Sequence, residues 1–301
     1  MGKETAMKIL NFGSLNIDYV YRVDYIVQPG ETIASKDLKV FPGGKGLNQS
    51  VAFAKAGAEV YHAGLIGEDG RFLKEYCKEQ GIHTEFIEEC KERTGNAIIQ
   101  VSDKGENCII LFPGANRKIT RDYIERVFEF FGAGDMLVLQ NEINMISHLI
   151  EKGKEKGMTV ALNVSPYDAT LAACDLSNVD VFLMNEVEGE QITGEKEYKR
   201  IVENIKQKYP EAKLVLTLGE QGAVYSDSEE EYYQEACQVS VVDTTAAGDT
   251  FTGYFLVDLL EEKGKQKALK TATYASALAV SKQGASVAIP RREEVDSYLQ
   301  K

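Results

Sequence analysis

Two hydrophobic patterns alternate from about residue 115 onward. Runs of four or five apolar residues are separated by longer stretches in which apolar residues recur every three or four positions. The first pattern predicts buried strands and the second predicts amphipathic helices. We therefore expect an α/β fold, with a mostly parallel central sheet and helices on both faces. The predicted strands cover residues 8–13, 136–139, 159–162, 179–183 and 214–218, and the predicted helices cover residues 46–57, 120–131, 145–156, 196–208, 248–262 and 266–281.

A different pattern occupies two segments of the first 112 residues. Between residues 18 and 41, tyrosine and valine alternate with more polar residues, and a Pro-Gly pair marks a turn, which favours an antiparallel ribbon. A second ribbon is predicted from residues 95–100 and 107–111. We therefore predict one domain over residues 1–301, with a small β-sheet lid inserted at about 16–42 and 95–112. An open ribbon face needs a cover, so the lid should close over a pocket or contact a second subunit.

Composition narrows the class of protein. The 301 residues are 44% hydrophobic, enough for a sizeable core, and carry a net charge of −13. That charge argues against a nucleic acid or an anionic membrane as partner. No apolar run approaches the length of a membrane span, and residues 1–6 lack the apolar core of a signal peptide, so we expect a cytoplasmic protein. The five cysteines are scattered without metal-binding spacing and are expected to be reduced thiols.

The most informative stretch is residues 243–253. Three small residues, Ala246, Ala247 and Gly248, precede Asp249 and a predicted helix. Small residues at a helix start let an anion approach free N–H groups, and the helix dipole favours negative charge there. A carboxylate beside such an anion hole would repel a phosphate, but it suits the general base that deprotonates an attacking hydroxyl. The plainer interpretation, in which Asp249 only caps the helix, stays open on this stretch alone.

A second glycine-rich motif lies at residues 41–49. Its glycines permit close approach to a ligand, Lys45 offers a compact positive charge, and Asn48 offers both a donor and an acceptor. The spacing matches neither a Walker A loop nor a dinucleotide fingerprint. A helix-entry turn with incidental polarity is the alternative.

Five separated motifs, taken in order, resemble the PfkB-type carbohydrate kinase family and, within it, the ribokinase group. The similarity runs from residue 8 to about residue 298, and the motifs lie at residues 13–18, 43–48, 185–188, 217–222 and 243–249. It implies a ribokinase-like fold and transfer of the ATP γ-phosphoryl group to a primary hydroxyl of a sugar, with O5 of ribose as the expected acceptor. Another sugar or a nucleoside (fructose, deoxyribose, adenosine) stays open as the substrate, as does a non-catalytic sugar or nucleotide sensor.

The resemblance also implies residue roles. Asp249 would be the base, with the backbone of Ala246, Ala247 and Gly248 as the anion hole. The sugar would be bound by Asn16, Asp18, Gly44, Lys45, Asn48 and Glu142, together with Asp249. The nucleotide would be bound by Asn185, Thr217, Gly219, Gly222, Gly248 and Thr273, with Ala277 beside the adenine.

Metal ions are implied in two places. Asn185 and Glu188 match an Asn-x-x-Glu motif that would position Mg²⁺ through water, although the same spacing is typical of a helix N-cap with a capping-box acid. A monovalent cation, expected to be K⁺, would be held by Asp243 and Thr245 and by the backbone of Ala279, Lys282 and Gly284. The family pattern has a serine where this chain has Ala288, and Ser286 is the available substitute.

A further departure from the family is Tyr254, which stands where the family usually has a small residue. We expect it to repack the helix behind the anion hole. The tyrosines of the lid, Tyr19, Tyr21 and Tyr25, favour a homodimer that forms through the lid.

Overall fold

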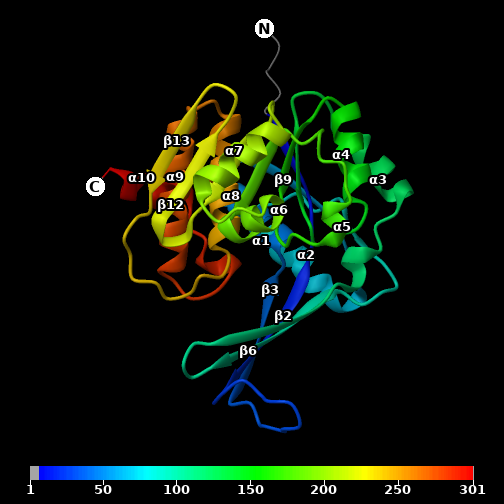
Figure 1. Ribbon diagram of the computed structural model, residues 1–301. Helices are drawn as coiled ribbons and strands as arrows, with labels where there is room; N and C mark the ends of the chain where they lie inside the picture. Colours follow the sequence, from blue (N-terminus) through cyan, green and yellow to red (C-terminus); the bar gives the residue numbers. More distant parts are fainter. Residues whose placement is uncertain (1–6, 301) are drawn as a thin grey trace.

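The computed structural model describes residues 7–300 (Figure 1). The six N-terminal residues, for which the sequence predicts no signal peptide, lie outside this range. Within it, the largest element is a nine-stranded sheet in the order β13-β12-β11-β10-β9-β8-β1-β4-β5. The pairs from β5 to β11 are parallel, and the hairpin β12–β13 is antiparallel to β11. The strands are β1 Lys8–Phe12, β4 Glu59–Ile66, β5 Ile87–Glu89, β8 Met136–Gln140, β9 Thr159–Asn163, β10 Val181–Asn185, β11 Lys213–Thr217, β12 Gly222–Ser226 and β13 Glu231–Glu235.

Alternate residues of each central strand enter two separate hydrophobic cores. In β8, for example, Leu137 and Leu139 join one core while Met136 and Val138 join the other. Helices α3, α4, α5 and α7 cover the first face, and α1, α2, α8, α9 and α10 cover the second. The helices are α1 Lys45–Lys55, α2 Arg71–Glu79, α3 Arg121–Phe128, α4 Ile146–Glu155, α5 Ala169–Ala172, α6 Glu186–Thr193, α7 Tyr198–Lys208, α8 Ala247–Leu260, α9 Lys265–Val280 and α10 Arg292–Leu299. The predicted α/β fold class, with helices on both faces, is confirmed.

A second, four-stranded sheet projects from the main body (Figure 1). Its strands are β2 Asn16–Val23, β3 Asp37–Gly43, β6 Gly95–Ser102 and β7 Asn107–Phe112. The order is β3-β2-β6-β7, with β2 and β6 parallel and the outer pairs antiparallel. Both predicted ribbons therefore exist, and they join along β2 and β6. The division into one domain with an inserted lid stays a prediction.

Two parts of the main sheet were not predicted from the sequence. Strand β4, helix α2 and strand β5 lie between the two ribbons of the small sheet and extend the main sheet beyond β1. The antiparallel hairpin β12–β13 extends the sheet beyond β11. Within the ribbon predicted at residues 18–41, the second strand is paired with the first only from Asp37 onward.

No helix within residues 7–300 is long and apolar enough to cross a membrane. All five cysteines are free, as expected. Tyr254 is buried in α8 behind the anion hole, where its hydroxyl donates to the carbonyl of Pro290 at 2.9 Å and the guanidinium of Arg292 lies 4.9 Å from its ring centre.

Candidate active site

The polar motif residues meet at the edge of the sheet where the parallel strands end. Ligands of open α/β sheets bind at this edge, because the connections after the strands diverge there. Two cavities lie along it, of about 470 Å³ and about 650 Å³. Both are lined by Ala247 and Gly248 at the start of α8, so the cavities adjoin at the predicted anion hole. We name the first the sugar cavity and the second the nucleotide cavity, after the roles that the sequence predicts for their lining residues.

Asp249 lies at the base of the sugar cavity and is almost fully buried. Asn48 donates to its Oδ2 atom at 3.1 Å, and Gln49 donates to its Oδ1 atom at 3.0 Å. Burial raises the pKa of the carboxyl group, and the charge of Lys45 and the two amide donors only partly offset that rise. A buried carboxylate with a raised pKa and an open cavity in front of it has the properties of a general base.

The start of α8 presents backbone N–H groups beside this carboxylate. Ala246 precedes the helix in the left-handed conformation, with φ 60°, which is uncommon for a residue other than glycine. The Ala247 N–H is engaged, since it donates to the carbonyl of Thr244 at 3.2 Å. Among the described residues, no acceptor pairs with the N–H of Gly248 or Asp249. The anion hole predicted from Ala246, Ala247 and Gly248 is thus open at Gly248 and Asp249 and occupied at Ala247.

Gly248 faces open space. A Cβ atom placed on it would meet nothing within 4 Å, although the residue lines both cavities. Packing within the protein therefore does not require glycine at this position. A ligand that approaches the backbone closely does require it, because any side chain would occupy the space between the two cavities.

The sugar cavity collects every residue for which the sequence predicts a sugar contact. Asp18 and Asn16 come from β2, and Glu142 follows β8. Ser14 donates to Oε2 of Glu142 at 2.5 Å, and Asn116 donates to Oδ1 of Asn16 at 2.7 Å, so both acceptors are held in place. The sugar cavity is lined by Asn16, Asp18, Gly44, Lys45, Asn48, Glu142, Glu188 and Asp249.

The carboxylate of Asp18 lies directly against the backbone of Gly43 in the paired strand β3. A Cβ atom at residue 43 would collide with all three atoms of that carboxylate group, which explains the glycine. Burial, with a smaller contribution from the charge of Glu142, raises the pKa of Asp18 to about 7. Asp18 therefore changes charge near neutral pH in the absence of a ligand.

Lys45 supplies the positive charge of the sugar cavity. It is the first residue of α1, and its backbone N–H donates to Oε2 of Glu142 at 3.2 Å. Burial alone would lower the pKa of its ammonium group, but the charges of Asp249, Glu142 and Glu188 raise it overall. Lys45 thus stays protonated among three carboxylates and attracts an anionic group into the site.

The nucleotide cavity collects the other predicted set. It is lined by Asn185, Thr217, Gly219, Gly222, Gly248, Thr273 and Ala277. The hydroxyl of Thr273 donates to the carbonyl of Leu269 one turn back in α9, at 2.9 Å, so the helix contributes an apolar wall rather than a hydrogen bond. The sequence did not point to the segment of residues 236–241, which also lines this cavity.

Asn185 and Glu188 form a capping box at the start of α6. The Oδ1 atom of Asn185 accepts from the N–H groups of Val187 at 2.8 Å and Glu188 at 3.0 Å, while Oε2 of Glu188 accepts from the Asn185 N–H at 3.0 Å. The capping interpretation of this motif therefore applies. Glu188 is nevertheless buried at the wall of the sugar cavity, and the capping box uses only its Oε2 atom, so a water-mediated contact to Mg²⁺ stays a prediction.

The residues predicted to hold a monovalent cation come from the loop before α8 and from the end of α9 with the turn that follows it. Asp243 accepts from the N–H of Thr245 at 2.9 Å and from the N–H of Gly284 at 3.0 Å. The carbonyl of Ala279 accepts from the N–H of Lys282 at 3.1 Å. The hydroxyl of Ser286 pairs with Tyr76 at 2.9 Å and is thus engaged away from Asp243. Within residues 7–300, no group of three or more His, Cys, Asp and Glu side chains could hold a metal ion.

The structure also adds lining residues that the motifs do not contain. The sugar cavity is covered by apolar side chains of the small sheet, namely Ala97, Ile99, Ile109 and Leu111. The sequence predicted that the ribbons form a lid over a pocket, but it did not identify these four side chains. The hydrogen bond from Gln49 to Asp249 was not predicted, because Gln49 follows Asn48 within a predicted helix and has no motif of its own.

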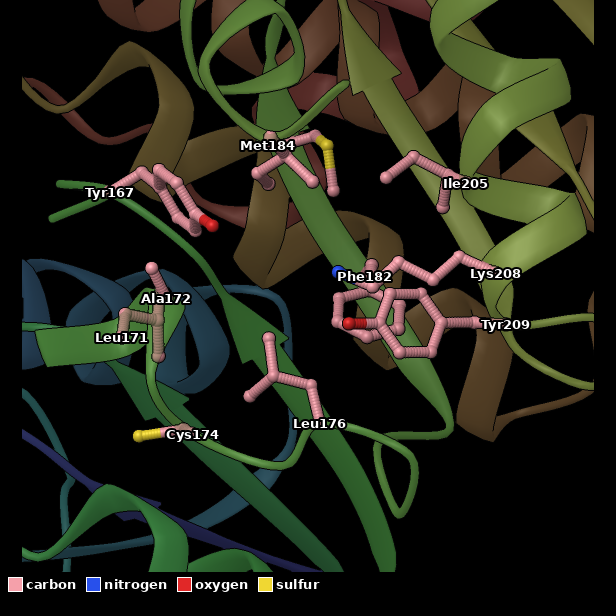
Figure 2. Close-up of a pocket in the computed structure, with 11 residues that line it drawn as sticks. Tyr167, Leu171, Ala172, Cys174, Leu176, Phe182, Met184, Ile205, Lys208 and Tyr209 are labelled. Atoms are coloured by element: carbon pink, nitrogen blue, oxygen red, sulfur yellow. The ribbon is translucent and has the colours of Figure 1, made fainter. Parts of the chain in front are cut away.

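A third hollow, between α5 and α7, is not a ligand site. Figure 2 shows that Tyr167, Leu171, Phe182 and Tyr209 gather around it. Its volume of about 20 Å³ is close to the space that one water molecule needs, and its walls belong largely to one of the two hydrophobic cores.

The chain is similar to known carbohydrate kinases over nearly its whole length. The pfkB family carbohydrate kinase model matches residues 6–292. Ribokinase of Haemophilus influenzae is 35% identical over 298 residues, which cover 96% of this chain and 97% of that protein. Deoxyribokinase of Salmonella typhi is 30% identical over 306 residues, covering 97% of this chain and 99% of that protein. The structure of Arabidopsis thaliana ribokinase complexed with ribose and ATP is 29% identical, has a TM-score of 0.87, and the alignment covers 99% of this chain and 100% of that one. The chain therefore belongs to the pfkB family and is an ATP-dependent carbohydrate kinase.

Proposed function

We propose that this protein phosphorylates D-ribose, converting D-ribose and ATP into D-ribose 5-phosphate and ADP. One observation carries the proposal. Residues from all five motifs, Asp249 among them, line a single cavity that adjoins the nucleotide cavity at Gly248. A sugar held there would present its primary hydroxyl to Asp249 and to the phosphate end of the nucleotide. The similarity to ribokinases supports ribose as the sugar.

The proposed reaction uses the residues as follows. Asn16, Asp18 and Glu142 accept hydrogen bonds from the secondary hydroxyls and fix the sugar ring. Asp249 accepts the proton of O5 as that oxygen forms a bond to the γ-phosphorus, while the bond from the γ-phosphorus to the bridging oxygen of ADP breaks. The N–H groups of Gly248 and Asp249, with the ammonium of Lys45, stabilise the charge on the transferring group. Mg²⁺ bound with the nucleotide would supply further positive charge.

Water must be kept from the γ-phosphoryl group, because ATP would otherwise be hydrolysed. The apolar lid residues Ile99, Ile109 and Leu111 cover the sugar cavity and suit this task. The lid also exposes Ile110, Phe112, Leu38 and Val40 to solvent in a single chain. We propose that these side chains are covered by the lid of a second copy in a homodimer, in the cytoplasm where ATP is available. Light scattering that detects only a monomer at micromolar concentration would contradict the dimer.

The test of the substrate is an ADP-release assay with a panel of acceptors. D-ribose, 2-deoxy-D-ribose, D-fructose and adenosine should be compared by kcat/KM, each in K⁺ and in choline. We expect D-ribose to exceed each of the others by about tenfold or more, because a site built to bind a hydroxyl rejects the analogue that lacks it. A preference for 2-deoxyribose or adenosine would overturn the ribose assignment, and ADP release independent of any acceptor would overturn the sugar kinase mechanism.

A further inference from the structure

Five polar side chains lie beneath Asp249 with no exposure to solvent. They are Asn11 of β1, Gln49 and Ser50 of α1, His62 of β4 and Gln140 of β8. Burying one amide or imidazole costs free energy unless it is hydrogen-bonded, so five together in one core need an explanation. None of them lines the sugar cavity or the nucleotide cavity.

These side chains form one continuous chain of hydrogen bonds that ends on the carboxylate. Gln49 donates to Oδ1 of Asp249 at 3.0 Å. Gln140 then donates from the same amide nitrogen to Oε1 of Gln49 and to Oδ1 of Asn11, both at 2.8 Å. Asn11 donates to the hydroxyl of Ser50 at 2.8 Å. We name Asn11, Gln49, Ser50, His62 and Gln140 the buried network.

The direction of every bond follows from the charge at one end. An ionised carboxylate only accepts, so Gln49 must present its NH₂ group to Asp249 and its oxygen to Gln140. Gln140 must then donate, which leaves Asn11 to donate to Ser50. The Ser50 hydroxyl therefore donates to Nδ1 of His62 at 2.8 Å. The imidazole can accept this bond only when neutral, and burial lowers its pKa to about 4.

The buried network also holds the first turn of α1, which carries two of the predicted sugar contacts. Asn11 donates a second hydrogen bond to the carbonyl of Gly46 at 2.7 Å, between Lys45 and Asn48. The adjacent residues Asn48 and Gln49 donate to different oxygens of Asp249. The carboxylate is thus fixed at both oxygens by one turn of α1, and that turn is fixed from below by the network.

We propose that Gln49 and Gln140 are positioning residues that hold the carboxylate of Asp249 in the orientation in which it accepts the sugar proton. Gln49 acts directly on the carboxylate, and Gln140 acts through Gln49, since it makes no hydrogen bond to Asp249. The inference rests on the proposed role of Asp249 as the base. It assigns to Gln49 and Gln140, which line neither cavity, a function beyond filling the core.

The charged groups that face Asp249 set the background for a pH measurement. Lys45 of α1 lowers the pKa of Asp249, and Glu142 after β8 raises it. Asp18 faces Glu142, and Glu188 faces Lys45. Loss of the Gln49 donor leaves these charges in place, so a shift of the acid limb of kcat in the variant reports the missing hydrogen bond.

The test compares Gln49→Met, Gln49→Glu and Gln140→Met with the wild-type enzyme, using D-ribose and ATP over pH 5 to 9. Gln49→Met should lower kcat about 10- to 100-fold, as expected for a lost hydrogen bond to a charged group, and leave the KM for ATP within about twofold. The acid limb of kcat should move to higher pH by about one unit. Gln49→Glu keeps the shape but brings a second carboxyl group beside Asp249, so its acid limb should move at least as far.

Gln140→Met should lower kcat by a smaller factor, and the Gln49→Met/Gln140→Met double variant should be no slower than Gln49→Met alone, because Gln140 acts through Gln49. The matched control is Asn144→Leu. Asn144 also bridges buried backbone, with hydrogen bonds to both backbone groups of Ile119 at 2.8 and 3.1 Å, but it makes none to Asp249. Asn144→Leu should lower the free energy of unfolding and leave the acid limb of kcat at the same pH as in the wild-type enzyme.

Folding is checked for each variant by thermal unfolding. If Gln49→Met does not fold, Gln49→Glu and Gln140→Met decide the question. Folded Gln49 and Gln140 variants with kcat within twofold of wild type and an unmoved acid limb would overturn the proposal. Should Asp249→Ala itself keep its turnover, the base assignment fails instead, so the two failures are distinguishable.

Discussion

Asn48 and Asp249 are 201 residues apart in the chain, yet the amide nitrogen of Asn48 lies 3.1 Å from Oδ2 of Asp249. The bond joins α1, which carries the sugar contacts, to α8, which begins at the anion hole. The two helices approach closely because Gly253 of α8 has no side chain, and a Cβ atom there would collide with Ala52 of α1. The proposed substrate binding and proton transfer therefore depend on one pair of packed helices.

Gly248 and Gly253 should respond differently to the same substitution. Gly248→Val places a side chain in open space between the two cavities, so we expect kcat/KM to fall about 100-fold or more while the melting temperature changes little. Gly253→Val forces α1 and α8 apart and should cost about 1–3 kcal/mol of unfolding free energy. Calorimetry and an ADP-release assay measure the two effects. Equal destabilisation by both substitutions would contradict the close approach of a ligand to Gly248.

Asp18→Asn should stabilise the ligand-free protein at the expense of sugar affinity. The pKa of Asp18 is raised from 3.8 to about 7, so between these values the folded protein binds a proton that the unfolded chain has lost. The stability contributed by this group is therefore present below about pH 4 and is lost as the pH rises to about 7. Asn does not titrate, so the variant should gain about 1 kcal/mol or more over wild type between pH 5 and pH 8.

Thermal unfolding at pH 5 and pH 8 measures that gain, and binding of D-ribose should weaken about 10- to 100-fold in the same variant. A stability difference that does not depend on pH would show that Asp18 does not titrate in this range.

The cation site gives a prediction about this chain's departure from its family. Ala288 lacks the side-chain oxygen of the serine expected there, and Ser286 is paired with Tyr76. We expect Ala288→Ser to increase the ratio of kcat in K⁺ to kcat in choline about twofold or more, since it adds an oxygen ligand. Asp243→Ala should reduce that ratio to about one. An unchanged ratio in both variants would exclude these loops as the cation site.

The residues that line the sugar cavity could be picked out from the sequence where they stand in short motifs. Lys45, Asn48 and Asp249 stand beside glycines or small residues in the first turns of helices, and Asp18 lies near the start of β2. Such local patterns can be recognised in a single sequence. The collinear order of the motifs then placed them at one edge of the sheet.

The buried network could not be predicted in the same way. Asn11 and Gln140 are single polar residues in apolar strands, and their partners come from α1 and from the neighbouring strand. Only the register of β1 against β8 brings them together. The hairpin β12–β13 was missed for a related reason, because most of β13 is polar and exposed and gives little hydrophobic signal.

The most direct test of the account is the turnover of Asp249→Ala with D-ribose and ATP. With the proposed base removed, kcat should fall by about three decades or more, while binding of ATP, which meets Gly248 and the nucleotide cavity, should stay within a few-fold of wild type. An Asp249→Ala enzyme that keeps a near-normal kcat would contradict the assignment of this carboxylate as the group that deprotonates the sugar.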